Sequence, residues 1–207
     1  DTAGNTSTAT SKAFTLDTTA LAPTLSIATD TGAYANDGST KIGIFTISGL
    51  EASSATSSGL AQAMYQIDSA AGAWTTLAAG VTSFTLGTAV ADGSHMAYVR
   101  EIDVAGNTSS ITSKFILLDT TIATPTVALA TDSGLSSSDG ITNKRAFTVS
   151  GLESLGATAT AGVSGFDHFE YQLDGTAGAW TTAASTVTDF TLGTAVADGT
   201  HTVYVRE

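Results

Sequence analysis

Residues 84–101, FTLGTAVADGSHMAYVRE, return later in the chain as residues 190–207, FTLGTAVADGTHTVYVRE. The two stretches are identical at 15 of 18 positions. Each carries an Ala-Asp-Gly turn signal between two segments in which apolar and polar residues alternate. Such alternation is typical of half-buried strands, because successive side chains of a strand point to opposite faces. The sequence therefore predicts the same pair of strands twice.

The duplication extends over most of the chain. The motif LDTT at residues 16–19 recurs at residues 118–121. The motif FTISGLE at residues 45–51 recurs as FTVSGLE at residues 147–153. These motifs are 102 positions apart and the stretches above are 106 apart, so the second copy holds four additional residues within 154–170. A period near 100 residues is longer than a solenoid unit and is the size of a small all-β domain.

Turn signals divide each repeat into short expected strands. In the first copy these strands are expected at residues 24–28, 42–48, 63–68, a short segment around Trp74, 83–88, 95–103 and 110–118. No segment has a helical period over ten or more residues. The predicted fold class is all-β: tandem immunoglobulin-like Greek-key β-sandwiches of about seven strands. The chain has no cysteine, so the disulfide of such sandwiches is absent.

The repeats are shifted in phase along the chain. Residues 1–17 match residues 103–119 at 11 of 17 positions. We therefore expect residues 1–17 to be the final strand of a preceding repeat or a donor strand, residues 18–119 to be one Ig-like repeat, and residues 120–207 to be a second repeat lacking its final strand.

Two explanations of this phase remain open. In the first, the chain is a window of a longer array. In the second, the N-terminal strand of one molecule completes the last repeat of the next, a head-to-tail contact that generates an open filament. The residues expected in such strand exchange are Thr6, Ser11, Phe14, Leu16, Val203 and Val205.

The charge of the chain excludes several classes of partner. Seven basic and 19 acidic residues give a net charge of −12. Nucleic-acid binding and docking on anionic lipid both need a basic surface, so neither is expected. No apolar run approaches the roughly 20 residues of a membrane span, so no membrane insertion is expected in this segment. An acidic surface of this kind repels itself or collects cations.

The topology of the expected sandwich gathers carboxylates at its two ends. The end that receives the incoming linker is expected to hold Asp17, Glu51, Glu101, Asp103 and Asn107. The opposite end and its counterpart in the second repeat are expected to hold Asp30, Asp37, Asp119, Asp132 and Asp139. Calcium takes six to eight oxygen ligands, many of them from carboxylates. These residues are therefore candidate metal ligands, and Ca²⁺ is the expected cofactor.

One strand places charge on the face that we assign to the core. Val99, Glu101 and Asp103 share this face because they are two residues apart. A buried charge needs a partner, and two partners remain open. One is a calcium ion. In the other, Asp103 and Asn107 only make side-chain turns with the hairpin backbone, while Glu101 pairs with Arg100 or a lysine.

An ordered set of motifs covers essentially the whole chain. The set comprises LDTT followed by Pro-Thr, ATDTG or ATDSG, DGIT, FTISGLE or FTVSGLE, AWTT, ADGSH or ADGTH, and VREIDVAGNTS. It resembles the bacterial immunoglobulin-like repeats of large secreted adhesins and biofilm-associated proteins. The resemblance implies extender domains outside the cell or on its surface, many of them stiffened by Ca²⁺. Their partners are neighbouring repeats of the same chain or identical subunits.

Three functions remain open. The first is a structural extender of an adhesin or surface fibre. The second is a self-assembling filament subunit joined by strand donation. The third is a glycan- or ice-binding module, which would need a flat array of threonines or an exposed aromatic groove. The threonines here alternate with apolar residues as ordinary solvent-facing strand positions, and Trp74 and Trp180 are expected to pack over the end of a core rather than to form sugar-stacking platforms. No enzyme is expected, because the sequence shows no nucleophile elbow or phosphate loop and its carboxylates lie at loop tips.

Overall fold

The computed structural model describes residues 1–32, 34–154 and 164–207. Most of the segment that holds the expected insertion of the second repeat lies outside the described residues. Contacts between residues gather into two compact parts, which are residues 1–28, 44–86 and 96–115, and residues 29–43, 87–95 and 116–207. This division does not test the limits of the two repeats, residues 18–119 and 120–207, which stay a prediction.

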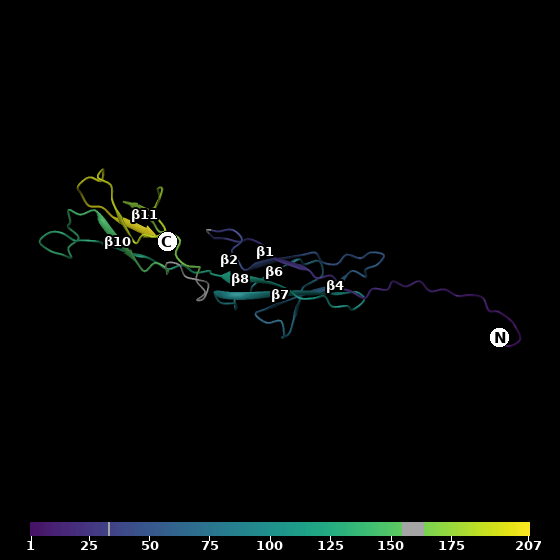
Figure 1. Cartoon of the computed structure of the whole chain (residues 1–207). Coiled ribbons are helices and arrows are strands. Elements are labelled where there is room, and N and C mark those ends of the chain that lie inside the picture. Colours follow the sequence, from purple (N-terminus) through teal and green to yellow (C-terminus); the bar gives the residue numbers. More distant parts are fainter. Residues whose placement is uncertain (33, 155–163) are drawn as a thin grey trace. The chain divides into compact units, whose positions relative to one another are not determined.

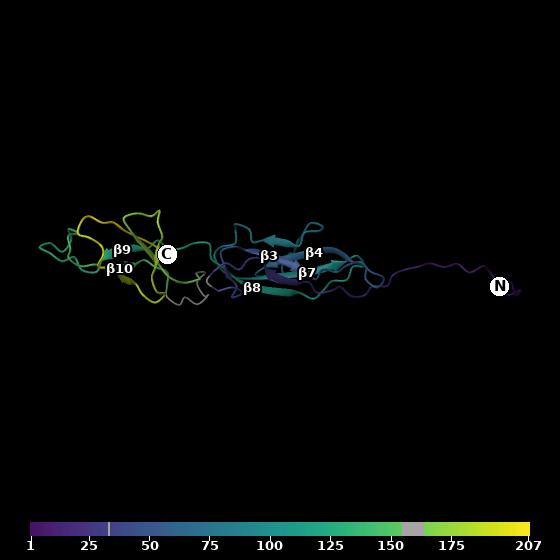
Figure 2. The same ribbon diagram turned by 90° about the horizontal axis from the view of Figure 1, so that it is seen from above.

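Two sheets are formed within the first repeat (Figure 1, Figure 2). The first has the order β1-β3-β6 and consists of β1 (Thr24–Ile27), β3 (Ile44–Ser48) and β6 (Ser83–Thr85). The second has the order β2-β8-β7-β4-β5 and consists of β2 (Ser39–Thr40), β4 (Leu60–Ile67), β5 (Thr75–Thr76), β7 (Gly93–Asp103) and β8 (Thr112–Leu118). The all-β fold class predicted from the sequence is confirmed.

Aromatic side chains join these sheets. On β3, Phe45 and Ile47 are 0 % and 2 % exposed and alternate with more exposed polar residues, as the period of two requires. The ring of Phe84 on β6 stacks on Phe45, with centroids 5.1 Å apart, and on Tyr65 of β4, with centroids 4.2 Å apart. Phe84 thus contacts both sheets, which is the packing of a β-sandwich.

Strand β2 was not expected from the sequence. Thr40 pairs with Leu118 of β8 in parallel orientation and is only 2 % exposed. Its hydroxyl donates to the carbonyl of Thr29 at 3.1 Å and accepts from the backbone N–H of Thr31 at 3.2 Å. A strand of two residues has no periodicity, so the turn-forming residues around it predicted only a loop.

The second repeat forms two three-stranded antiparallel sheets. One has the order β13-β10-β9 and consists of β9 (Thr126–Leu129), β10 (Ala146–Ser150) and β13 (Asp189–Thr191). The other has the order β12-β11-β14 and consists of β11 (Glu170–Leu173), β12 (Thr181–Thr182) and β14 (Val203–Arg206). Phe190 stacks on Tyr171 with centroids 4.1 Å apart, which repeats the contact between β6 and β4.

Candidate metal site

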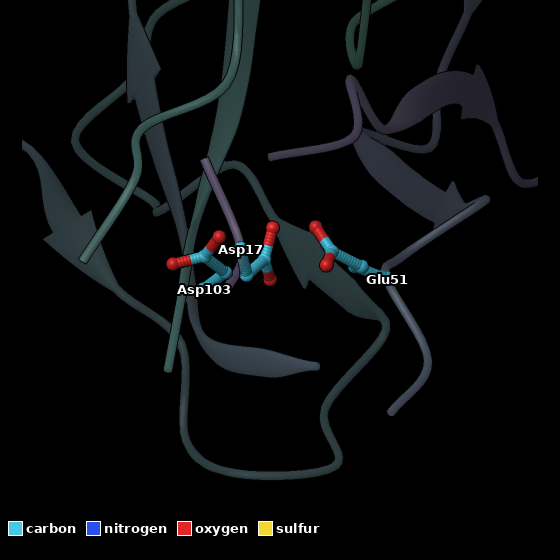
Figure 3. Close-up of side chains that lie close together, drawn as sticks. All are labelled: Asp17, Glu51 and Asp103. Atoms are coloured by element: carbon cyan, nitrogen blue, oxygen red, sulfur yellow. The ribbon is translucent and has the colours of Figure 1, made fainter. Parts of the chain in front are cut away.

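Three carboxylates from distant parts of the sequence meet at one end of the first repeat. Asp17 lies in the segment before β1, Glu51 follows β3, and Asp103 is the last residue of β7. One carboxylate oxygen from each lies within 4.8 Å of the others. Figure 3 shows the three side chains next to one another, with Asp17 between Asp103 and Glu51. Within the described ranges, no other three His, Cys, Asp or Glu residues bring their ligand atoms so close.

Asp103 lies at the end of β7, on the face of the strand that points into the core. Val99, Glu101 and Asp103 are 0 %, 0 % and 1 % exposed, which confirms that they share the buried face. The carboxylate of Asp103 accepts hydrogen bonds from the backbone N–H and from Nδ2 of Asn107, both at 2.7 Å. Nδ2 of Asn107 also donates to the carbonyl of Asp17 at 3.1 Å. The expected side-chain turn of the hairpin therefore forms, and it also holds the linker against the hairpin.

Backbone N–H groups orient Asp17. The N–H of Ser58 donates to its Oδ2 at 2.6 Å and that of Thr19 donates to its Oδ1 at 3.3 Å. The hydrogen bond from Ser58 lowers the pKa of Asp17, because it stabilises the ionised form. An ionised carboxylate has about four lone-pair positions, so both oxygens retain capacity to bind a cation.

Glu51 is held in a similar way. Its Oε2 accepts from the backbone N–H of Leu21 at 3.0 Å, and its Oε1 accepts from the hydroxyl of Ser57. Ser57 and Ser58 lie in a loop whose backbone is constrained at Gly59. A Cβ at Gly59 would lie 2.9 Å from the backbone nitrogen of Ser53, and Gly59 has a φ of +85°. Sequence reasoning missed Ser57 and Ser58. The glycine that follows them was the available signal of a constrained loop.

Glu101 is the buried member of the group. Its Oε2 accepts from the backbone N–H of Glu51 at 3.2 Å, whereas its Oε1 is buried and has no hydrogen-bond partner. Burial, followed by the negative charges of Glu51 and Asp103, raises the pKa of Glu101. The expected pairing with Arg100 is wrong, because adjacent residues of a strand face opposite sides. The Arg100 guanidinium lies over the ring of Trp74 instead, 4.3 Å from its centroid.

The residues present fit a divalent cation. The ligand atoms that Asp17, Glu51 and Asp103 provide are all carboxylate oxygens, which hard cations such as Ca²⁺ prefer. Glu101 is a buried carboxyl with an unpartnered oxygen, which a nearby cation would stabilise. An open hollow of about 440 Å³ is lined by Asp17 and Glu51, so an ion can approach the half-buried side of the group from solvent.

The structure does not bring the other predicted ligands into such a group. The four aspartates of the loops after β1 and β9 cap their own backbone: Asp30 accepts from the N–H of Gly38 (3.0 Å), Asp37 from Ser39 (2.8 Å), Asp132 from Gly140 (2.9 Å) and Asp139 from Ile141 (3.0 Å). Asp119 is 8 % exposed and accepts from the N–H groups of Ser164 (2.5 Å) and Thr121 (3.4 Å). A role for these residues as metal ligands stays a prediction.

Asp92, a carboxylate outside the group of Asp17, Glu51 and Asp103, holds the segment that follows β8. Its Oδ1 accepts from the hydroxyl of Thr120 at 2.8 Å and its Oδ2 from the hydroxyl of Thr121 at 3.1 Å. These hydrogen bonds, that of Thr120 first, lower the pKa of Asp92. The backbone immediately after β8 is therefore held by side-chain contacts that need no ion.

Replacing Asp92 with alanine is expected to lower the free energy of unfolding by about 1 kcal/mol, because two hydrogen bonds to one carboxylate are lost. Thermal unfolding should show a decrease in Tm of roughly 4–8 °C for each kcal/mol in a domain of this size. The matched control is Asp198→Ala, because Asp198 occupies the same turn of the second repeat and is exposed. Equal decreases in Tm for Asp92→Ala and Asp198→Ala would contradict a stabilising role for the hydrogen bonds between Asp92 and the two threonines.

Comparison with known protein families agrees with this fold. Residues 19–120 match the family model of the bacterial Ig-like domain. No curated protein matches the chain. The described residues contain no helix of the length and apolarity that a membrane crossing requires. Domains of this family are typical of surface proteins and are usually non-catalytic. Residues 19–120 of this chain are therefore a bacterial Ig-like domain.

Proposed function

We propose that the chain is a pair of structural extender repeats from an extracellular bacterial adhesin or surface fibre, in which Ca²⁺ bound by Asp17, Glu51 and Asp103 fixes the linker that enters the repeat. The Ig-like domain and its near duplication support a structural role. The net charge of −12 suits a surface that stays solvated at high local concentration.

The carboxylate group is the observation that carries this proposal. Asp17 belongs to the linker, whereas Glu51 and Asp103 belong to the body of the domain. An ion that binds all three therefore joins the linker to the domain. When bound, Ca²⁺ supplies positive charge and shared coordination. The carbonyl of Asp17 and the amide of Asn107 already hold the two segments together, so the binding groups are pre-positioned.

The expected free energy of Ca²⁺ binding indicates that the ion acts mainly on the position of the linker. Extracellular calcium modules bind with a Kd of about 10⁻⁴–10⁻³ M. At a free concentration ten times the Kd, one site adds about 1.4 kcal/mol to the free energy of unfolding. This is small beside the roughly 5–15 kcal/mol of a typical domain. We therefore expect Ca²⁺ to restrict the linker more than it stabilises the sandwich.

Hydrogen exchange tests the proposal within the intact chain. Ca²⁺ is expected to slow exchange of the amides of Thr19, Leu21 and Ser58 relative to the same chain in chelator, because these amides donate to Asp17 and Glu51. The amides of Gly38 and Ser39 are the internal control, since they donate to carboxylates outside the group. Equal exchange of the first three amides with and without Ca²⁺ would refute the proposal.

The glycan- or ice-binding function is not supported in the same way. Of the two surfaces that it would need, a flat array of threonines or an exposed aromatic groove, the aromatic one is not offered by the tryptophans. Trp74 and Trp180 are each half-buried, and each has an arginine guanidinium 4.3 Å from its ring centroid. Arg100 and Arg206 each lie over one face of these rings, so that face is not open to a sugar.

A further inference from the structure

Two loops of the second repeat meet at one histidine. His201 lies between the Ala-Asp-Gly turn at residues 197–199 and β14, and Asp174 follows β11. Nδ1 of His201 is 2.7 Å from Oδ2 of Asp174, and Nε2 of His201 is 2.9 Å from the carbonyl oxygen of Ala197. These two contacts, called the histidine bridge below, join the loop after β11 to the turn before β14.

Both partners of this imidazole are hydrogen-bond acceptors. An ionised carboxylate and a backbone carbonyl carry no proton to donate. A neutral imidazole has one N–H, so it can donate to only one of the two, and its other nitrogen then places a lone pair against an oxygen. An imidazolium has two N–H groups and donates to both Asp174 and Ala197. The geometry around His201 therefore favours the charged form of the ring.

Charged groups from two other elements act on His201. The hydrogen bond to Asp174, followed by that to Ala197, raises the pKa of His201 above its ordinary value of 6.5. The same hydrogen bond is the main cause of the lowered pKa of Asp174. Arg145, the residue before β10, opposes the rise in the pKa of His201 through its positive charge, while its guanidinium donates to the carbonyl of Val196 at 2.8 Å.

Asp174 also holds the backbone next to the histidine. Its Oδ1 accepts from the N–H of Thr202 at 2.9 Å, and its own N–H donates to the carbonyl of Thr202 at 2.8 Å. Asp174 has a φ of +59°, in the left-handed region that aspartate adopts more readily than most residues. One carboxylate oxygen of Asp174 is thereby placed on the backbone and the other on the imidazole.

The first repeat contains corresponding contacts. Nε2 of His95 is 2.8 Å from the carbonyl oxygen of Ala91, and Oδ1 of Asp68 accepts from the N–H of Met96 at 2.9 Å. Asp68 has a φ of +60°, close to that of its counterpart Asp174. The contact between a histidine and the Ala-Asp-Gly turn therefore belongs to the fold of the repeat.

This turn has a structural role in the first repeat. Asp92 directly follows Ala91 and accepts from the hydroxyls of Thr120 and Thr121, in the segment after β8. The turn that the histidine contacts is therefore also the turn that holds the segment leading into the second repeat.

We propose that the histidine bridge is a proton-dependent switch, in which imidazolium at His201 fastens the turn at residues 197–199 to the loop after β11 and the neutral ring releases one of the two. Because the pKa of His201 is raised, the stability that the bridge contributes is fully present below 6.5 and is lost as pH rises through the folded value. The inference is independent of Ca²⁺, since no residue of the bridge belongs to the group of Asp17, Glu51 and Asp103.

Nuclear magnetic resonance of the intact chain with labelled imidazole nitrogens tests the protonation step. As pH rises from about 5 to about 8, both nitrogens of His201 are expected to stay protonated beyond 6.5. Asp174→Asn is expected to lower the midpoint of this titration, because the amide can donate to a neutral Nδ1 while its oxygen keeps the hydrogen bond from Thr202. A wild-type midpoint at or below 6.5, or equal midpoints in the two chains, would overturn the proposal.

Hydrogen exchange in chelator tests whether the bridge holds the backbone. The protection factors of the amides of residues 174 and 202, which correct the exchange rates for their intrinsic pH dependence, are expected to fall several-fold as pH rises through the His201 midpoint. Asp174→Asn is expected to abolish this fall, because its amide bonds the neutral ring. The amide of Gly140, which donates to Asp132 in the same repeat, is the internal control.

His168→Gln is the matched control variant. Nδ1 of His168 is 2.6 Å from a carboxylate oxygen of Asp167, its neighbour in sequence, so this pair does not join two loops. We expect His168→Gln to leave the pH-dependent fall in protection unchanged and His201→Gln to abolish it. The same pH-dependent fall in the wild-type and His201→Gln chains would refute the switch, even with a raised titration midpoint.

Discussion

Replacing Asp103 with asparagine is expected to weaken Ca²⁺ binding at least about tenfold, a loss of about 1.4 kcal/mol in binding free energy. Asp103 is 1 % exposed and is one of the three residues, with Asp17 and Glu51, whose carboxylate oxygens lie within 4.8 Å of one another. Its replacement removes one negative charge from the group, and with it a charge-assisted ligand of the ion. Isothermal titration calorimetry of the intact chain measures the change, and the Ca²⁺-dependent increase in Tm should disappear with it.

The matched control for this experiment is Asp37→Asn. Asp37 was predicted from the sequence as a ligand at the opposite end of the domain, but its carboxylate caps the N–H of Ser39 at 2.8 Å. We expect its replacement to leave the Ca²⁺ affinity of the site formed by Asp17, Glu51 and Asp103 unchanged. Loss of affinity with Asp37→Asn, together with normal binding by Asp103→Asn, would place the ion in the loop after β1 and contradict the assignment.

Replacing Glu101 with glutamine is expected to stabilise the chain in chelator by about 1–3 kcal/mol at neutral pH, because it removes a buried negative charge of which one oxygen, Oε1, has no hydrogen-bond partner. The amide oxygen of glutamine retains the hydrogen bond from the N–H of Glu51. A gain of this size corresponds to an increase in Tm of roughly 4–8 °C per kcal/mol. In saturating Ca²⁺ the gain should shrink, since the ion stabilises the wild-type carboxylate.

The pH dependence of the metal-free chain follows from two pKa shifts of opposite sign. The pKa of Glu101 is raised above 4.5, mainly by burial, so the stability that its protonation confers is fully present below 4.5 and is lost as pH rises through the folded value. The pKa of Asp17 is lowered from 3.8, so its contribution is present above 3.8 and is lost as pH falls through the folded value. Glu101→Gln should remove only the first of these dependences.

The control for Glu101→Gln is Glu207→Gln, which changes the equivalent residue of the second repeat. Glu207 is half-buried, whereas Glu101 is 0 % exposed, so the effect on stability in chelator should be smaller. Calorimetric unfolding in chelator compares the two variants. No gain with Glu101→Gln would mean that the buried charge of Glu101 is already compensated without an ion, and the reason for a cation at the site would be lost.

The sequence predicted the longer strands because their alternation reports burial directly. The segments expected at residues 42–48 and 95–103 are β3 and β7, within two residues at each boundary. Strand β2 was missed because its pairing with Leu117 and Leu118 depends on a tertiary contact, with no local pattern to indicate it. The same holds for Thr40, whose burial depends on hydrogen bonds to the loop before it.

The sequence could predict which carboxylates meet, because the topology of the sandwich determines which loops lie at the same end. Loops at one end of a sandwich meet, so Asp17, Glu51 and Asp103 were expected together, and the parity of β7 placed Asp103 on the buried face. The serines at positions 57 and 58 were not predictable in the same way, because their hydrogen bonds to the group depend on the path of a loop. Of the partners of Glu101 that the sequence left open, the pairing with Arg100 is wrong, because neighbouring residues of a strand face opposite sides.

The measurement that tests the central claim most directly is anomalous X-ray diffraction from crystals of the chain grown in saturating Ca²⁺. The account predicts an anomalous peak about 2.3–2.6 Å from carboxylate oxygens of Asp17, Glu51 and Asp103. A map with no peak among these three carboxylates, or with peaks only in the loops that hold Asp37 and Asp139, would contradict it.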